Sequence, residues 1–253
     1  MLSIHFISDV PWQMALFFVT VFVAGIIRGC IGFGFSVLVV AVNALFLDPA
    51  SLVPIVIMME MVASLHMLIT VWKDALWSKM LWISIGMLMG IPIGVYILSF
   101  APQDILRLFI SIIIFLMTVF VLKGVSYRGS MANNLFASAG LVSGFVSGVA
   151  AAGGIVIASF LSYTSLPMKQ VRATLVVYLL ITSAIFIPSI AIAGKLNEQI
   201  FYTIAFAIIP MFLGIVIGGK LYGLLDEKKM RLVFLWSLSV LAIIGMIRSF
   251  FSF

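Results

Sequence analysis

The sequence is poor in charge, cysteine and histidine. Of its 253 residues only 9% are Asp, Glu, Lys or Arg, whereas 64% are apolar and the mean hydropathy is +1.34. A soluble domain carries roughly 25% charged residues, and a domain of this size has too small an interior to bury so many apolar side chains. The composition therefore excludes a soluble enzyme, a nucleic-acid-binding protein and a disordered chain, and it indicates an integral membrane protein.

The scarcity of reactive residues narrows the chemistry further. One cysteine, Cys30, excludes an intramolecular disulfide, and two histidines, His5 and His66, argue against a metal cluster. Neither a G-x-S-x-G nor an H-E-x-x-H motif occurs, and no nucleotide-binding motif is present. We therefore expect no enzyme activity, no cofactor and no direct use of ATP. Residues 1–11 contain no Lys or Arg, so they do not predict a cleaved signal peptide.

Long uncharged runs fill most of the chain. They cover residues 10–27, 29–47, 49–72 (interrupted by Glu60 and His66), 80–103, 108–122, 129–168, 173–194, 199–219 and 232–247. A helix of the 40 residues in 129–168 would be about 60 Å long, twice the hydrocarbon thickness of a bilayer. This run and the stretch 10–47 both contain glycines near their middle. We therefore expect each to fold as a helical hairpin, either spanning fully or re-entrant as two half-helices that meet inside the membrane.

The distribution of cations tests this interpretation. If each long run crosses the membrane once, six Lys and Arg face one side and seven the other, which violates the positive-inside rule. If each long run is a hairpin, eleven Lys and Arg face one side and three face the other. The eleven are Arg28, Lys73, Lys79, Lys123, Arg128, Lys169, Arg172, Lys220, Lys228, Lys229 and Arg231, and the three are Arg107, Lys195 and Arg248. The hairpin topology therefore fits better, and it predicts that both termini lie outside the cytoplasm.

An internal repeat is also visible. The segment 25–29 matches 140–144, Pro49 matches Pro167, and 90–94 matches 214–218, at offsets of 115, 118 and 124. The sequence thus predicts an all-α polytopic membrane protein of one transporter domain, with repeat 1 at about 10–123, a linker at 124–131 and repeat 2 at about 132–250. Each repeat has five helical segments (eight long helices in all if each hairpin counts once), so the second must enter from the opposite face, giving the inverted topology of many secondary transporters.

The glycine-rich tracts carry a family resemblance. The segment Gly25-Ile-Ile-Arg-Gly-Cys-Ile-Gly-Phe-Gly34, its echo at 140–148 with Gly153-Gly154, and the pattern Leu166-Pro-Met-Lys-Gln-Val-Arg-Ala-Thr174 resemble the sulfite exporter TauE/SafE family. The resemblance implies a multi-pass plasma-membrane transporter that exports a small sulfur-containing anion, such as sulfite or an organosulfonate. The identity of the anion stays open, as do an anion channel and a carrier for another small organic anion. Its partners would be the anion, the lipid bilayer and, as an open alternative, a second copy in a homodimer, but no nucleic acid.

Arg28 is the first candidate for substrate binding. A cation deep in a membrane is costly and usually serves a partner or a substrate, and a guanidinium fork suits sulfite or sulfonate oxygens. The alternatives are that Arg28 reaches the cytoplasmic headgroups or pairs structurally with Glu60. We interpret Cys30, two residues later, as a small packing residue.

The helix breaks are the second candidate. Helices that stop at Gly32, Gly34, Gly148, Gly153 and Gly154 would expose backbone N–H groups and positive helix N-termini to an anion. The alternative is that these glycines only permit close helix packing.

Several other polar residues complete the candidate set. Glu60, the one acid well inside a predicted span, and His66 are candidates for proton coupling; they differ in direction by about 120° on a helix and do not form a neighbouring pair. Further substrate-binding candidates next to the breaks are Ser36, Asn43, Thr174 and Tyr178, each with an interhelical hydrogen bond as its alternative. Lys169 and Arg172 could attract anions or simply anchor the cytoplasmic end, the reading we favour.

Overall fold

The structure is a computed structural model that describes residues 10–122, 132–162, 167–221, 235–236 and 238–247. The predicted linker 124–131 and the segment before residue 10 lie outside the described residues, as do Lys123, Lys228, Lys229, Arg231 and Arg248. Within the described residues the ordered elements are helical and none is a strand. In chain order they are α1 (Pro11–Ile31), α2 (Phe35–Asn43), α3 (Pro49–Val71), η1 (Trp72–Asp74), α4 (Trp77–Phe100), α5 (Gln103–Leu122), α6 (Asn133–Ala150), α7 (Gly153–Ser162), α8 (Met168–Ile192) and α9 (Glu198–Leu221), followed by the helical residues Leu238–Ile247.

Five of these helices are long and apolar enough to cross a bilayer: α1, α3, α4, α8 and α9. Their outward faces carry large apolar side chains, among them Ile69 and Ile192, which are 85% and 88% exposed. Water would penalise such a surface, whereas lipid accommodates it, because a helix satisfies its own backbone hydrogen bonds. The helices therefore present their outer faces to hydrocarbon.

Both glycine-rich tracts are interrupted. α1 ends at Gly32, whose φ is 90°, and α2 begins directly after Gly34, whose φ is 96°. Glycine adopts this left-handed conformation without the steric cost that a Cβ would add. The second interruption separates α6 from α7, with Ala151 at a φ of 52°. The short helix that follows each interruption contacts the helix before it, α2 with α1 and α7 with α6.

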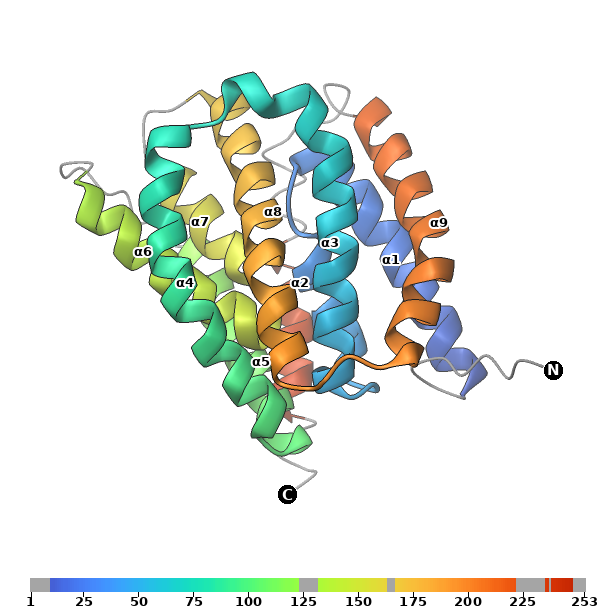
Figure 1. The fold of residues 1–253 in the computed structure, drawn as a ribbon. Helices are drawn as coiled ribbons and strands as arrows, with labels where there is room; N and C mark the ends of the chain where they lie inside the picture. The colour runs from blue at the N-terminus through green and yellow to red at the C-terminus, as the bar shows by residue number, and fades with distance from the viewer. Residues whose placement is uncertain (1–9, 123–131, 163–166, 222–234, 237, 248–253) are drawn as a thin grey trace.

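Two glycine-lined helix pairs flank the centre of the molecule. The most extensive interhelical contacts join α4 to α6 and α1 to α9. A Cβ added at Gly94 would lie 2.8 Å from the Cα of Gly148, and one at Gly29 would lie 2.9 Å from the Cα of Gly218. The backbones thus meet almost directly, as small residues allow inside membranes. Between these pairs α3 and α8 pack on each other (Figure 1).

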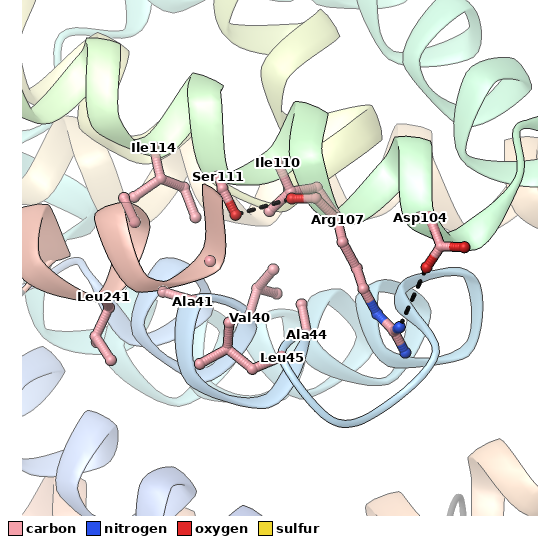
Figure 2. A pocket seen from close by; sticks show the side chains of 12 residues that line it. Val40, Ala41, Ala44, Leu45, Asp104, Arg107, Ile110, Ser111, Ile114 and Leu241 are labelled. Atoms are coloured by element: carbon pink, nitrogen blue, oxygen red, sulfur yellow. Dashed lines mark hydrogen bonds and ion pairs between the residues drawn. The ribbon is translucent and has the colours of Figure 1, made fainter. Parts of the chain in front are cut away.

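Two hollows open between the elements. A cavity of about 80 Å³ lies between α2, α5 and the segment 241–245 (Figure 2). A wider and more open depression of about 720 Å³ lies where α3, η1 and the start of α8 meet, and it is lined by Trp72, Lys73 and Lys169 among others.

Candidate functional site

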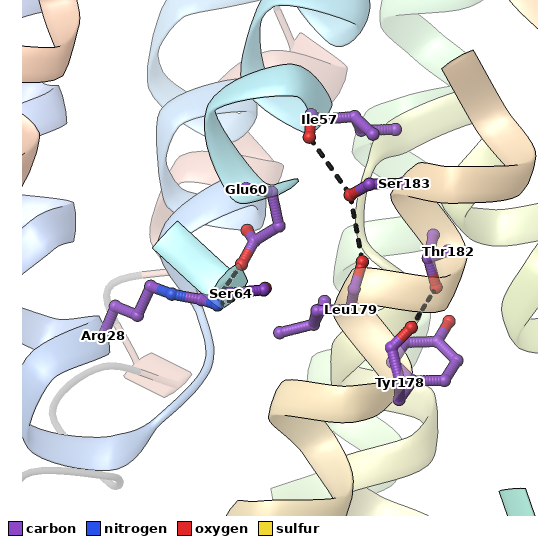
Figure 3. Close-up of polar contacts among 8 residues, drawn as sticks. All are labelled: Arg28, Ile57, Glu60, Ser64, Tyr178, Leu179, Thr182 and Ser183. Atoms are coloured by element: carbon purple, nitrogen blue, oxygen red, sulfur yellow. Dashed lines mark hydrogen bonds and ion pairs between the residues drawn. The ribbon is translucent and has the colours of Figure 1, made fainter. Parts of the chain in front are cut away.

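A buried ion pair lies in the core of the bundle. Arg28 in the last turn of α1 is fully buried, and its Nη1 pairs with Oε1 of Glu60, which is 2% exposed. Its Nη2 donates a hydrogen bond of 2.7 Å to Oγ of Ser64 (Figure 3). Glu60 stands at the midpoint of α3, and Ser64 follows one turn later on the same helix face. The structure therefore pairs a cation at the end of α1 with an anion at the middle of α3.

The pairing decides between the two alternatives for Arg28. An isolated charge in the membrane interior is very costly, and a close partner of opposite sign offsets much of that cost. Arg28 is wholly buried and bonded to α3, so it does not extend to the headgroups. The same geometry suits either a fixed structural pair or a guanidinium whose carboxylate partner exchanges with a substrate.

A second polar cluster surrounds the start of α7. The hydroxyls of Tyr178 and Ser147 are 3.1 Å apart, and both residues are buried. Tyr178 lies near the middle of α8, and a Cβ added at Gly153 would come within 2.5 Å of its hydroxyl oxygen. Only glycine therefore fits as the first residue of α7, directly against this pair of hydroxyls.

Two further buried hydroxyls, those of Thr182 and Ser183, lie on α8. The hydroxyl of Ser183 lies 2.9 Å from the carbonyl oxygen of Leu179 and 3.1 Å from that of Ile57, so it links α8 to α3 about one turn before Glu60 (Figure 3). Thr182 donates to the carbonyl oxygen of Tyr178 at 2.9 Å. The two polar clusters therefore sit on adjacent helices.

Arg172 contacts the first helix break from the other half of the chain. Its Nη2 donates to the carbonyl oxygen of Gly29 at 3.0 Å, and its side chain covers Gly32, where an added Cβ would lie 2.6 Å from its Cγ. A cation at a helix C-terminus satisfies carbonyl groups left over at the end of the helix. Lys169 behaves differently, because its side chain is 78% exposed and pairs with Asp74 at 3.0 Å. Lys169 and Arg172, which share one predicted role, therefore lie in different surroundings: Lys169 is at the surface and Arg172 lies against α1.

Some of the remaining predicted residues make local bonds. Asn43 donates to the carbonyl oxygen of Val39 at 2.9 Å, and Thr174 accepts from the N–H of Leu76 at 3.1 Å, which ties α8 to the chain before α4. Ser36 is buried in the first turn of α2, which begins without a side-chain cap.

The other predicted glycines and His66 differ in their surroundings. Gly148 packs against α4, as the packing alternative proposed, whereas a Cβ at Gly154 would meet only Leu179 at an ordinary 3.4 Å. His66 is exposed on α3 and lies edge-on to Phe212 at 5.4 Å, while Glu60 points into the core. The structure therefore brings Arg28 and Glu60 together, and separately Tyr178 and Gly153.

Sequence reasoning missed three serines that complete these clusters: Ser64, Ser147 and Ser183. The spacing of Ser64, four residues after Glu60, is a signal that could have identified it, because both residues share one helix face. Ser183 bonds to a helix 126 residues away in sequence, so no local pattern indicates it. Within the described residues no group of three His, Cys, Asp or Glu could hold a metal ion.

Several apolar membrane-crossing helices and a buried charge pair define an all-helical, multi-pass membrane protein. A family model described as Sulfite exporter TauE/SafE matches residues 17–244, so the chain belongs to this family of membrane transporters. The match confirms the resemblance carried by the glycine-rich tracts. No curated protein and no solved structure matches the chain.

Proposed function

We propose that the protein is a secondary transporter that exports a small sulfur-containing anion, sulfite or an organosulfonate, across the plasma membrane. The observation that carries the proposal is the fully buried guanidinium of Arg28, one turn before a helix break and bonded to Glu60 and Ser64. A guanidinium binds the oxygens of an oxyanion through parallel charge-assisted hydrogen bonds. The family match supports transport of this class.

Glu60 would hold the place of the substrate when the site is empty. Its carboxylate offers the guanidinium of Arg28 the same chemistry as a sulfite or sulfonate anion, so the two compete for one cation. A proton on Glu60 would remove its negative charge and free Arg28 for the substrate. We therefore assign the coupling proton to Glu60, with His66 as a second candidate on the outer face of α3.

The two interrupted helices would supply further donors. α2 begins after Gly34 with no side-chain cap, and α7 begins at Gly153 beside the hydroxyls of Tyr178 and Ser147. Unpaired amides at a helix N-terminus carry partial positive charge and favour anions. Ser36 and Asn43 on α2, Gly148 on α6, Gly154 on α7 and Thr174 on α8 complete the proposed neighbourhood.

The helix contacts support two inverted repeats. Under the repeat, α1 corresponds to α6, α3 to α8 and α4 to α9. α1 packs on α9 and α6 packs on α4, so exchanging the two repeats converts one contact into the other. The equivalent helices α3 and α8 pack on each other. A two-fold axis would generate this reciprocal pattern, and the odd number of segments per repeat would place that axis in the membrane plane.

The charges support an orientation with both termini outside the cytoplasm. Lys73, Lys79, Lys169, Arg172 and Lys220 belong to helix ends on one side of the bundle, and Arg107 and Lys195 to ends on the other (Figure 1). The richer side would face the cytoplasm. The open depression lined by Lys73 and Lys169 lies on that side and would draw anions towards the entrance.

The test is a flux assay in proteoliposomes with sulfite, sulfate, thiosulfate and short organosulfonates, with and without a pH gradient. A carrier gives slow flux that saturates as the anion concentration rises, whereas flux through a channel does not saturate over the same concentrations. Since each variant removes a charge-assisted contact, Arg28→Ala and Glu60→Gln should each reduce flux by about tenfold or more. Lys195→Gln, which removes an exposed cation at the other end of the bundle, serves as the matched control and should retain flux.

A folding control accompanies these variants. Removing one member of a buried pair leaves an uncompensated charge, whereas replacing both with apolar residues is often neutral. The double variant Arg28→Met/Glu60→Met should therefore melt near the native temperature and still lack flux. Normal flux in both single variants would contradict the proposed site.

A further inference from the structure

The 80 Å³ cavity between α2, α5 and the segment 241–245 has a mainly apolar wall and one cation. Val40 of α2, Ala44 directly after α2 and Leu241 line the cavity, and the guanidinium of Arg107 lies at one end of the row (Figure 2). Arg107 is near the start of α5, so the cavity lies at the end of the bundle opposite the depression of Lys73 and Lys169. It is separate from Arg28 and Glu60, which do not line it.

Arg107 has donor groups to spare. Its Nη1 lies 3.6 Å from Oδ1 of Asp104, and its Nη2 lies 3.5 Å from the carbonyl oxygen of Leu47, both long for a hydrogen bond. Its Nε is buried and has no hydrogen-bond partner within the described residues. A guanidinium carries five N–H donors in a planar fork, so donors remain for an incoming oxyanion.

We propose that this cavity is a second anion site, which binds a short-chain organic oxyanion, a sulfonate or carboxylate. The acid group would bond to Arg107, and the apolar tail would lie against Val40 and Ala44. The cavity limits the size of the ligand: since a cavity of about 150 Å³ takes the six non-hydrogen atoms of benzene, 80 Å³ takes about three, so it encloses the methyl group and part of the acid group of acetate or methanesulfonate, and the remaining oxygens lie beside the partly exposed Arg107.

The charges select a monoanion. Asp104 lies close enough to Arg107 to balance most of its charge, so a second negative charge on the ligand gains little. Sulfate has two charges and no apolar tail to bury against the cavity wall. The site should therefore prefer methanesulfonate and acetate to sulfate.

Thiol labelling tests the proposal in the full-length protein in nanodiscs. Ala44 lines the cavity and Cys30 is buried, so Ala44→Cys is introduced into a Cys30→Ala background. We expect an anionic methanethiosulfonate reagent to react about tenfold faster than a cationic one, because the charge-assisted contact favours it. Methanesulfonate should slow the reaction and sulfate should not.

The matched variants are Arg107→Gln and Lys195→Gln. Both remove one cation from the same end of the bundle, but Lys195 does not line the cavity. Arg107→Gln should abolish the preference for the anionic reagent and the protection by methanesulfonate, and Lys195→Gln should preserve both. An unchanged preference in Arg107→Gln would overturn the proposal.

Equilibrium dialysis with radiolabelled methanesulfonate gives a second readout without a cysteine variant. Because the proposed central site also takes a short sulfonate, the expected result is binding to the unmodified protein and to Arg28→Ala, with loss in the double variant Arg28→Ala/Arg107→Gln. No binding to the unmodified protein would overturn the proposal. Loss in Arg28→Ala but not in Arg107→Gln would assign the bound anion to the central ion pair instead, and would also overturn it.

Discussion

At the scale of single residues, Gly153 is the most confined position of the candidate site. A Cβ there would meet Ser147 and Tyr178, whereas one at Gly154 would meet only Leu179 at 3.4 Å. We predict that Gly153→Ala destabilises the protein by about 1–3 kcal/mol, because the start of α7 must move away from Ser143 and Ser147 of α6 as well as from Tyr178 of α8. Melting in detergent, together with flux, measures this effect.

Gly154→Ala is the control for that measurement. It adds the same methyl group to the same turn of α7 without a clash, so its melting temperature should stay close to native. Equal loss in the two variants would mean that the helix itself, and not the contact with Tyr178, depends on glycine.

Some site residues can be identified from the sequence because charged residues are rare in its apolar runs. Arg28 and Glu60 stand out because a charge inside a long apolar run needs a partner, and the structure pairs them. The contact of Arg172 with Gly29 is not visible in this way, because it spans 143 residues and depends on how the two halves pack. Hydroxyls such as Ser147 are equally hidden, since serine is ordinary in membrane helices.

At the scale of helices, the glycine-lined contact of α1 with α9 depends on one face of α9. A Cβ added at Gly218 would lie 3.0 Å from the Cα of Gly29, whereas the neighbouring Gly219 has nothing within 4 Å. We predict that Gly218→Ala separates the helices and destabilises the protein by about 1–3 kcal/mol. Thermal unfolding in detergent measures the change.

Gly219→Ala, by contrast, should stabilise the protein. Alanine is the better helix former by about 1 kcal/mol, and at Gly219 no packing opposes this gain. If both variants were stabilising, the close approach of α1 and α9 would not contribute to stability.

Helix boundaries follow the sequence only in part. The uncharged runs start at residues 80 and 173, but α4 begins at Trp77 and α8 at Met168. The difference arises because Lys79, Lys169 and Arg172 lie in the first turns, where long cationic side chains reach the interface or a neighbouring carbonyl. A charge therefore ends an uncharged run without ending the helix.

At the scale of the whole molecule, the proposed orientation predicts which residues face outward. Lys73 on η1 and Lys195 between α8 and α9 are both exposed and lie at opposite ends of the bundle. In a Cys30→Ala background, Lys195→Cys should react with a membrane-impermeant thiol reagent in intact cells. Lys73→Cys should react only after the membrane is opened, and the reverse pattern would contradict the orientation.

That this is a membrane protein could be predicted from composition, because so apolar a chain cannot fold as a soluble domain. The family match confirms this class. The inverted repeats and the two hairpins stay proposals that the helix contacts support. The relative positions of α2 and α7 could not be predicted, since they follow from the packing of α2 on α3, of α7 on α8, and of α3 on α8.

The contact of α1 with α9 also bears on biogenesis. α1 packs on α9, which leaves the ribosome long after it, while Glu60 emerges much sooner to neutralise Arg28. During membrane insertion α1 must therefore wait with its glycine face covered by lipid or by the insertion machinery. Truncation before α9 leaves this face without its partner, so the order of synthesis opposes early assembly of the bundle.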